Sequence, residues 1–169
     1  MNPPEYYLHM REHLPEQWAF IRCWIQSCRL SSLLEVGGGD GYAATFLPPG
    51  APYLNVDPSA LNPDSILAQW QEVLKAEHAG RWDGFLSMAT FDTAGNPEPL
   101  LDGVAEIRPR VACITFCLGL SDSDENEPRA GTAFCIVSKP WLARWAQAHN
   151  FGAAFASVAE HGVMLLMRQ

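Results

Sequence analysis

The sequence contains no long apolar run. No stretch of eighteen consecutive apolar residues occurs among its 169 residues, so we expect no membrane-spanning helix. The first residues, MNPPEYYLHMREHLPEQ, are too polar and proline-rich for a secretory signal. An apolar content of 48% is nevertheless enough for one well-formed core. We therefore predict a single soluble domain inside the cell, in the cytoplasm.

Positive charge is also scarce. Eleven Lys and Arg stand against nineteen Asp and Glu, which gives a formal net charge of −8. Such a chain is poorly suited to bind nucleic acid or an anionic membrane unaided, because both present dense negative charge. We therefore expect a small-molecule substrate or a protein partner.

The cysteines form no recognisable framework. Five of them are scattered through apolar segments, an odd number that does not suggest paired disulfides. Cys113 and Cys117 lack a second pair of ligands, so we predict no zinc and no other metal site. Buried small side chains are the simpler interpretation.

Apolar spacing predicts alternating helices and strands, without an internal repeat or a long linker. In the segment 63–80, one face of a helix carries Ile66, Leu67, Trp70, Val73 and Leu74, between Asp64 as a cap and a terminal glycine. The predicted helices span 5–14, 15–29, 41–47, 63–80, 96–109 and 138–152. The predicted strands span 31–36, 52–57, 82–91, 110–120, 153–158 and 162–169.

This order predicts an α/β fold: a Rossmann-like, doubly wound, mostly parallel sheet with helices on both faces. The last two strands are joined by AEHG, short enough for an antiparallel hairpin at the sheet edge. We divide the chain into an N-terminal helical cap or lid, 1–30, and an α/β domain, 31–169, within one compact unit.

The stretch SLLEVGGGDGYAATFL, residues 32–47, carries the most specific signal. A dinucleotide-binding loop needs G-x-G-x-x-G, but counting from Gly37 the last glycine would be Tyr42. No Lys-Ser or Lys-Thr follows, which excludes a Walker loop. The pattern is acid-x-Gly-x-Gly-x-Gly, at Glu35, Gly37, Gly39 and Gly41.

The sequence here resembles the class I S-adenosylmethionine-dependent methyltransferases. EVGGGDG resembles their first motif, and NVD, ending at Asp57, resembles the acid at the end of their second strand. RWDGFLSMATF is similar to the segment around their fourth strand, and WLARWAQAHNFG to their last helix. The resemblance covers residues 31–169, although only the first motif and Asp57 are specific.

The resemblance implies that S-adenosylmethionine is the cofactor. Glycines would let the backbone approach it, Glu35 would hold its ammonium group, and Asp57 would accept its ribose hydroxyls. Asp57 could instead serve simply as a turn residue before Pro58. The cofactor-binding residues predicted in this way are Glu35, Gly37, Gly38, Gly39, Gly41, Asp57 and Ser87.

The chain departs from the family between Asp57 and Trp82, where we find one helix in place of helix, strand and helix. We therefore expect a shortened fold without the third strand, and without the acid after it that meets adenine in the family. Leu61, Ile66 or Ser87 with Met88 could line a substitute adenine pocket.

No catalytic residue is evident. The strand GFLSM is not followed by Asn or Asp and two prolines, the pattern of family members that methylate amino groups. His9, His13, Asp92 and His161 are candidates for a base, and each could equally be a surface or capping residue.

Aromatic and acidic segments leave further alternatives open. Tyr6 and Tyr7 could cover the cofactor as a lid, or anchor the N-terminus to the core. The acidic segment 121–127 could border the acceptor pocket, or be a solvated loop. An exposed patch of Trp18, Trp24 and Trp141 would indicate self-association, and a homodimer is possible.

Three hypotheses for the function follow. The first is a methyltransferase acting on a small molecule. The second is a methyltransferase-fold protein without catalysis, which binds the cofactor or a protein partner. The third, weaker hypothesis keeps the cofactor but uses its sulfonium in another reaction.

Overall fold

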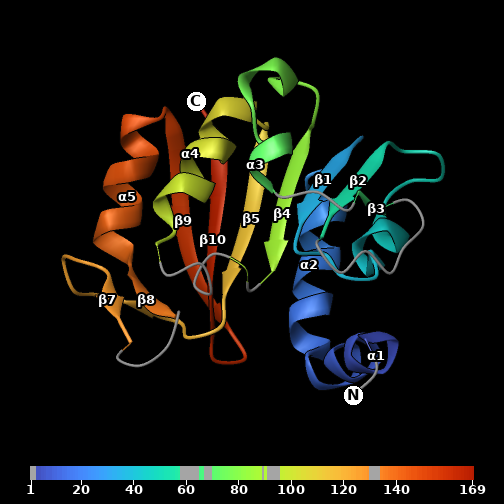
Figure 1. The fold of residues 1–169 in the computed structure, drawn as a ribbon, viewed down its shortest axis with the longest axis horizontal. Coiled ribbons are helices and arrows are strands. Elements are labelled where there is room, and N and C mark those ends of the chain that lie inside the picture. The colour runs from blue at the N-terminus through green and yellow to red at the C-terminus, as the bar shows by residue number, and fades with distance from the viewer. Residues whose placement is uncertain (1–2, 58–64, 67–69, 89, 91–95, 130–133) are drawn as a thin grey trace.

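The computed structural model describes residues 3–57, 65–66, 70–88, 90, 96–129 and 134–169 (Figure 1). The helices are α1 (Pro3–His13), α2 (Pro15–Ser27), α3 (Trp70–Val73), α4 (Glu98–Ile107) and α5 (Lys139–Ala148), with two 3-10 helices, η1 (Tyr42–Phe46) and η2 (Ala76–His78). The strands are β1 (Leu33–Val36), β2 (Tyr53–Val56), β3 (Ser65–Ile66), β4 (Gly84–Met88), β5 (Val111–Phe116), β6 (Leu120–Ser121), β7 (Glu127–Pro128), β8 (Cys135–Ser138), β9 (Phe151–Val158) and β10 (His161–Arg168).

Seven strands form the main sheet, in the order β3-β2-β1-β4-β5-β10-β9. The first five in this order are parallel, whereas β10 is antiparallel to both of its neighbours, β5 and β9. The predicted fold class is thus confirmed, including the C-terminal hairpin at the sheet edge. The strand order reverses between β1 and β4, and open α/β sheets bind ligands at the carboxyl end of such a reversal.

The expected absence of a third strand is wrong. Ser65 and Ile66 form β3, which pairs in parallel with Asn55 and Val56 of β2. A strand of two residues is too short to produce an alternating pattern, so periodicity could not predict it.

The helix predicted over 63–80 is also wrong in its extent. Its beginning contains β3, and the described remainder forms only the short helices α3 and η2, separated by Lys75 in an extended conformation. Val73 and Leu74 are buried as the periodicity predicted, but Ile66 joins the sheet. An apolar residue at helical spacing can equally supply a sheet edge, which periodicity alone cannot reveal.

A second sheet among the described residues has three strands in the order β6-β8-β7. Its strands β6 and β7 lie at the two ends of the acidic segment 121–127, and β8 follows that segment. Two of its strands contain only two residues each, and the sequence did not predict it.

At the start of α5, Ser138 caps the helix by accepting a hydrogen bond from the N–H of Trp141. Lys139 pairs with Asp122 at 2.9 Å, so part of the acidic charge is compensated within the fold.

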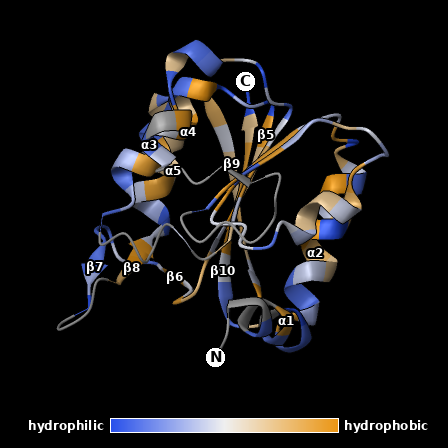
Figure 2. Ribbon diagram, turned by 45° about the vertical axis from the view of Figure 1, so that its right-hand side comes forward, coloured by the Kyte–Doolittle hydropathy of each residue, from blue (hydrophilic) through white to orange (hydrophobic). Residues whose placement is uncertain are grey.

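Two apolar clusters cover the two faces of the sheet. Figure 2 shows α3, α4 and α5 on one side and α1 and α2 on the other. The α2 side includes Ile21, Trp24 and Ile25, so the second helix of the predicted cap packs directly on the sheet. Trp24 is buried, and Trp18 and Trp141 pack against opposite clusters. These three tryptophans therefore form no exposed patch.

Among the described residues, no helix combines the length and the apolar character that crossing a bilayer requires.

The close packing of α4 against Leu74, the residue that follows α3, depends on Gly103. A Cβ at this position would lie 2.7 Å from the Cβ of Leu74. We expect Gly103→Ala to lower the free energy of unfolding by about 1–3 kcal/mol, because overpacking outweighs the gain in helix propensity. The measurement is urea unfolding followed by circular dichroism.

Gly152→Ala is the matched control. A Cβ there would come no closer than 3.5 Å to the atoms around it, so this variant should unfold like the wild type. If both variants had the same stability, the packing argument for Gly103 would be refuted.

Candidate functional site

The carboxyl ends of three neighbouring strands meet at a glycine-rich loop, residues 37–41. Val36 at the end of β1 pairs with Val56 on one side and with Ser87 on the other. This register brings Glu35, Asp57 and Ser87, all predicted cofactor-binding residues, to one edge of the sheet.

The loop needs glycine for its backbone conformation. Gly37, Gly39 and Gly41 have φ values of 76°, 55° and 74°, in the left-handed region that other residues rarely adopt. The predicted spacing of glycines thus corresponds to three left-handed positions.

Polar side chains from β2 and the residue after it fix this loop. The Gly39 N–H donates to Asp57 Oδ2 at 2.8 Å, and the Gly38 N–H donates to Asn55 Oδ1 at 3.2 Å. Asn55 Nδ2 in turn donates to the Gly39 carbonyl at 2.9 Å. Sequence reasoning missed Asn55, although it lies two residues before Asp57 and so on the same face of the strand.

Neighbouring protein atoms also require glycine in the loop. A Cβ at Gly38 would lie 2.5 Å from Asn55 Oδ1 and 2.6 Å from Glu35 Oε2. A Cβ at Gly37 would collide with the side chain of Thr90. At these two positions the protein's own packing excludes larger residues, in addition to any need for a ligand to approach.

Glu35 lies beneath the loop and is fully buried. The Tyr53 hydroxyl donates a hydrogen bond to Glu35 Oε2, while Oε1 is buried and has no partner among the described residues. Burial raises the pKa of Glu35 to about 7; the Tyr53 hydrogen bond opposes this rise, and the charges of Asp40 and Asp57 add to it. A cation placed beside Oε1 would favour the ionised carboxylate.

Buried polar atoms without partners gather at this edge. In the described part of the chain they are Arg11 Nε, Gln17 Nε2, Trp18 Nε1, Glu35 Oε1 and Ser87 Oγ. The first turn of α2 lies here, since the ring of Trp18 contacts that of Tyr42 in η1 at 5.0 Å. Buried polar groups normally find partners, so this concentration indicates the position of a polar ligand.

The first helix is held against the loop. Arg11 of α1 forms an ion pair with Asp40, and its guanidinium lies 4.2 Å from the ring centroid of Tyr42. Figure 1 shows α1 at the end of the sheet to which the β4 arrow points. The side chains of Tyr6 and Tyr7, the predicted lid, lie outside the described residues.

The candidate bases that the structure describes lie on two different segments of the chain. The rings of His9 and His13 lie 3.7 Å apart on α1, and both side chains are exposed. His161 Nδ1 lies 2.9 Å from the carbonyl of Ala159, within the turn between β9 and β10. Asp92 lies outside the described residues.

The substitute adenine pocket is only partly visible. Leu61 and the side chain of Ile66 lie outside the described part. Ser87 is buried, and Met88 packs against the cluster on the α2 side. Successive strand residues point to opposite faces, so Ser87 and Met88 face different sides of the sheet.

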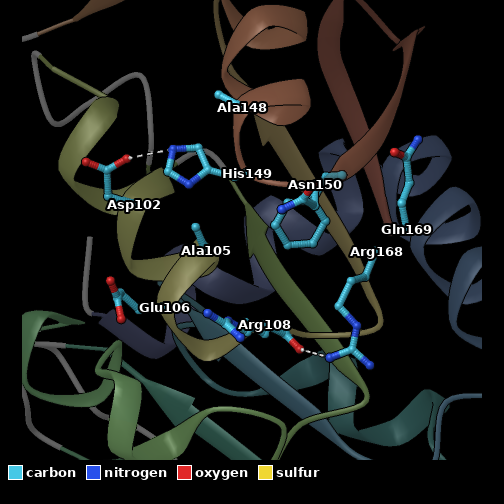
Figure 3. Close-up of a pocket in the computed structure, with 10 residues that line it drawn as sticks. Asp102, Ala105, Glu106, Arg108, Ala148, His149, Asn150, Arg168 and Gln169 are labelled. Atoms are coloured by element: carbon cyan, nitrogen blue, oxygen red, sulfur yellow. Dashed lines mark hydrogen bonds and ion pairs between the residues drawn. The ribbon is translucent and has the colours of Figure 1, made fainter.

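A groove of about 650 Å³ lies at the opposite edge, where α4 and α5 end (Figure 3). Three of its polar side chains have partners within the protein. Asp102 accepts a hydrogen bond from Trp145 Nε1 at 3.0 Å and lies 3.8 Å from His149 Nε2, and Arg168 donates to the carbonyl of Arg108 at 3.1 Å. None of the unpartnered buried atoms named above lines this groove, so we place the candidate site at the glycine loop.

Known structures share this architecture. A chain from the complex containing the Haloferax volcanii Trm112 methyltransferase activator aligns over 94% of this chain and 92% of its own, with a TM-score of 0.68 and 11% identity. Burkholderia thailandensis 1,6-didemethyltoxoflavin-N1-methyltransferase, solved with 1,6-didemethyltoxoflavin and S-adenosylhomocysteine, aligns over 100% and 91%, with a TM-score of 0.62 and 16% identity. Human N-acetylserotonin methyltransferase, solved with S-adenosylmethionine, aligns over 95% and 55%, with a TM-score of 0.63 and 13% identity.

A scan against protein-family models finds no match, and no curated protein matches the sequence. The structural similarity, at identities of 10–16%, is a similarity of fold. The chain therefore has the fold of the class I S-adenosylmethionine-dependent methyltransferases, as the motif EVGGGDG predicted.

The buried carboxylate predicts a specific pH dependence. Glu35 binds its proton more tightly when folded than when unfolded, so its contribution to stability falls as pH rises from about 4.5 through 7. We expect the difference in free energy of unfolding, Glu35→Gln minus wild type, to increase by about 2 kcal/mol between pH 5 and pH 8. Urea unfolding of the ligand-free proteins at both pH values measures it, and parallel profiles would contradict the assignment.

Proposed function

We propose that the protein is an S-adenosylmethionine-dependent methyltransferase acting on a small-molecule acceptor. The observation that carries this proposal is the buried Glu35 carboxylate, with one unpartnered oxygen, beneath a glycine loop that Asp57 holds in place. S-adenosylmethionine, when bound, supplies a methyl group carried on a sulfonium.

Glu35 would hold the ammonium group of the cofactor. Its Oε1 has no partner in the described part of the chain, and burial raises its pKa, so a cationic partner would relieve the cost of ionising it. Asp57 would accept the ribose hydroxyls. The Gly39 N–H already orients its carboxylate toward the loop.

The charge at this edge suits such a ligand. The carboxyl groups of Glu35, Asp40 and Asp57 surround the loop, and Arg11 pairs with Asp40. A ligand with both a sulfonium and an ammonium group would complement the remaining acidic charge.

Methyl transfer from a sulfonium is an in-line displacement, in which proximity and alignment are the protein's main contributions. An acceptor whose nucleophilic atom already has a free lone pair and no proton to lose needs no general base from the protein. A small-molecule acceptor is supported by the net charge of −8 and by the acceptors named for two of the similar structures.

A protein with this fold but without catalysis is the second candidate. The exposure of the His9 and His13 side chains favours it, because neither ring is held in a buried site as a catalytic base would be. This alternative predicts cofactor binding without turnover, so release of S-adenosylhomocysteine in the presence of nitrogen, oxygen and sulfur nucleophiles separates the two candidates.

Isothermal titration with S-adenosylmethionine and S-adenosylhomocysteine tests the cofactor site. We expect micromolar binding to the wild type, and a loss of at least about tenfold in Asp57→Ala, because the carboxylate serves both the loop and the ribose. Asp102→Ala, in the groove at the opposite edge, should bind like the wild type.

Failure of a folded wild-type protein to bind either compound would reject the enzyme hypothesis. Equal loss in Asp57→Ala and Asp102→Ala would indicate a general effect on the fold rather than a cofactor site at the glycine loop.

A further inference from the structure

We propose that a cavity of about 320 Å³ at the amino ends of the parallel strands binds the phosphate group of a small molecule. Four arginines line this arginine cavity: Arg81, Arg108, Arg110 and Arg168. Asp83, which also lines it, directly precedes β4, whereas the glycine loop follows β1. The two sites therefore lie at opposite edges of the sheet, and this inference does not rest on the proposed function.

Hydrogen bonds hold the segments that carry these arginines side by side. The Arg168 N–H donates to the Arg110 carbonyl at 3.0 Å, and Arg168 Nη1 donates to the Arg108 carbonyl at 3.1 Å (Figure 3). The Gly80 N–H, next to the fourth arginine, donates to the Ile107 carbonyl at 2.9 Å. The four positions are thus fixed by the backbone where α4 and β10 end and where β4 and β5 begin.

The acidic side chain of the cavity is already paired. Arg110 Nε donates to Asp83 Oδ1 at 2.5 Å, and Arg110 Nη2 donates to Oδ2 at 3.1 Å. The Ser31 N–H also donates to Oδ2, at 2.9 Å. The hydrogen bonds from Arg110 hold the pKa of Asp83 below its usual range. One arginine and the one acid that line the cavity therefore neutralise each other.

The other three arginines, Arg81, Arg108 and Arg168, keep their charge. Their side chains are exposed, and none forms an ion pair with another described residue. Like charges gathered in one place repel each other, and this chain has only eleven Lys and Arg in all. A bound anion would remove the repulsion.

Arg108 also occupies a position where an arginine is unfavourable. It follows α4 with a φ of 49°, in the left-handed region that glycine usually occupies at the end of a helix. A side chain retained at such a position has a reason to be there if it contacts a ligand.

The chemistry of the guanidinium group selects the ligand. It is always charged, it donates only, and its planar fork matches two oxygens of a phosphate. A carboxylate would bring a single negative charge to three cations. A phosphate monoester or a diphosphate brings two or more charges and enough oxygens to accept from several guanidinium groups.

The surroundings favour a small ligand over a long polyanion. The net charge of −8 would repel nucleic acid over its length, but salt screens exposed charges beyond about 8 Å, so a small anion responds mainly to the nearby arginines. The arginine cavity shares Arg108 and Arg168 with the groove of Figure 3. The acids Asp102 and Glu106 line that groove but not the arginine cavity, so the groove suits the part of the molecule that carries no negative charge.

Isothermal titration of the full chain with inorganic pyrophosphate, at low salt and neutral pH, tests the site. We expect binding to the wild type that is about tenfold weaker in Arg81→Gln and in Arg108→Gln, because each variant removes one charged donor. Arg22→Gln is the matched control: Arg22 is exposed on α2, has no ion pair among the described residues and lines neither cavity. It should bind pyrophosphate like the wild type.

Absence of pyrophosphate binding to the folded wild type, or wild-type affinity in both Arg81→Gln and Arg108→Gln, would overturn the site. Equally tight binding of acetate would overturn the preference for phosphate. Tighter binding of hexaglutamate or of a twelve-nucleotide RNA, lost in Arg81→Gln, would also overturn it and indicate a docking surface for an acidic protein or for nucleic acid.

Titration of the same proteins with S-adenosylhomocysteine separates this site from the proposed function. Arg81→Gln and Arg108→Gln should bind S-adenosylhomocysteine like the wild type, because the glycine loop lies at the other edge of the sheet. If the wild type bound pyrophosphate in an arginine-dependent manner but did not bind S-adenosylhomocysteine, the proposed function would fail and the phosphate site would stand.

Discussion

The contact between the Gly38 backbone and the Glu35 carboxylate is the constraint on which the site depends. Glu35 pairs with Asn55 across β1 and β2, so one strand register places the acid and the amide side by side beneath the loop. Because Gly38 has no side chain, its backbone can approach both. The side-chain amide of Asn55 accepts a hydrogen bond from the Gly38 N–H and donates one to the Gly39 carbonyl. Asp57, two residues later, accepts a hydrogen bond from the Gly39 N–H. Loop geometry, acid burial and the position of Asp57 are thus consequences of one packing arrangement.

This arrangement leaves the ligand-free protein with polar groups that it does not satisfy. A carboxylate oxygen, an amide nitrogen and an indole nitrogen are buried without partners in the part of the chain that the structure describes, and each lowers stability. The two apolar clusters on either face of the sheet supply the stability that tolerates this cost. Binding sites commonly contain such unpaired polar groups, and the stability of the rest of the fold compensates for their cost.

The sequence predicted the features that repeat or that have a fixed spacing. Glycines at alternate positions after an acid predicted the loop, and alternating apolar segments predicted the parallel sheet and the closing hairpin. Short elements without a period, such as β3 and the small sheet around β8, could not be predicted because two residues carry no pattern. Asn55 and Tyr53 escaped notice for another reason: their importance lies in contacts between distant segments, and each residue type is ordinary where it stands.

The position of β10 has a consequence for how the protein is made. This strand follows every other element along the chain, yet it lies inside the sheet, between β5 and β9. During synthesis β5 (Val111–Phe116) therefore has an open edge of unpaired backbone N–H and C=O groups until residues 161–168 have left the ribosome. The nascent chain cannot close its sheet progressively from one side to the other. Completion of the fold is consequently a late event, and the exposed edge of β5 is a surface that a chaperone could protect in the meantime.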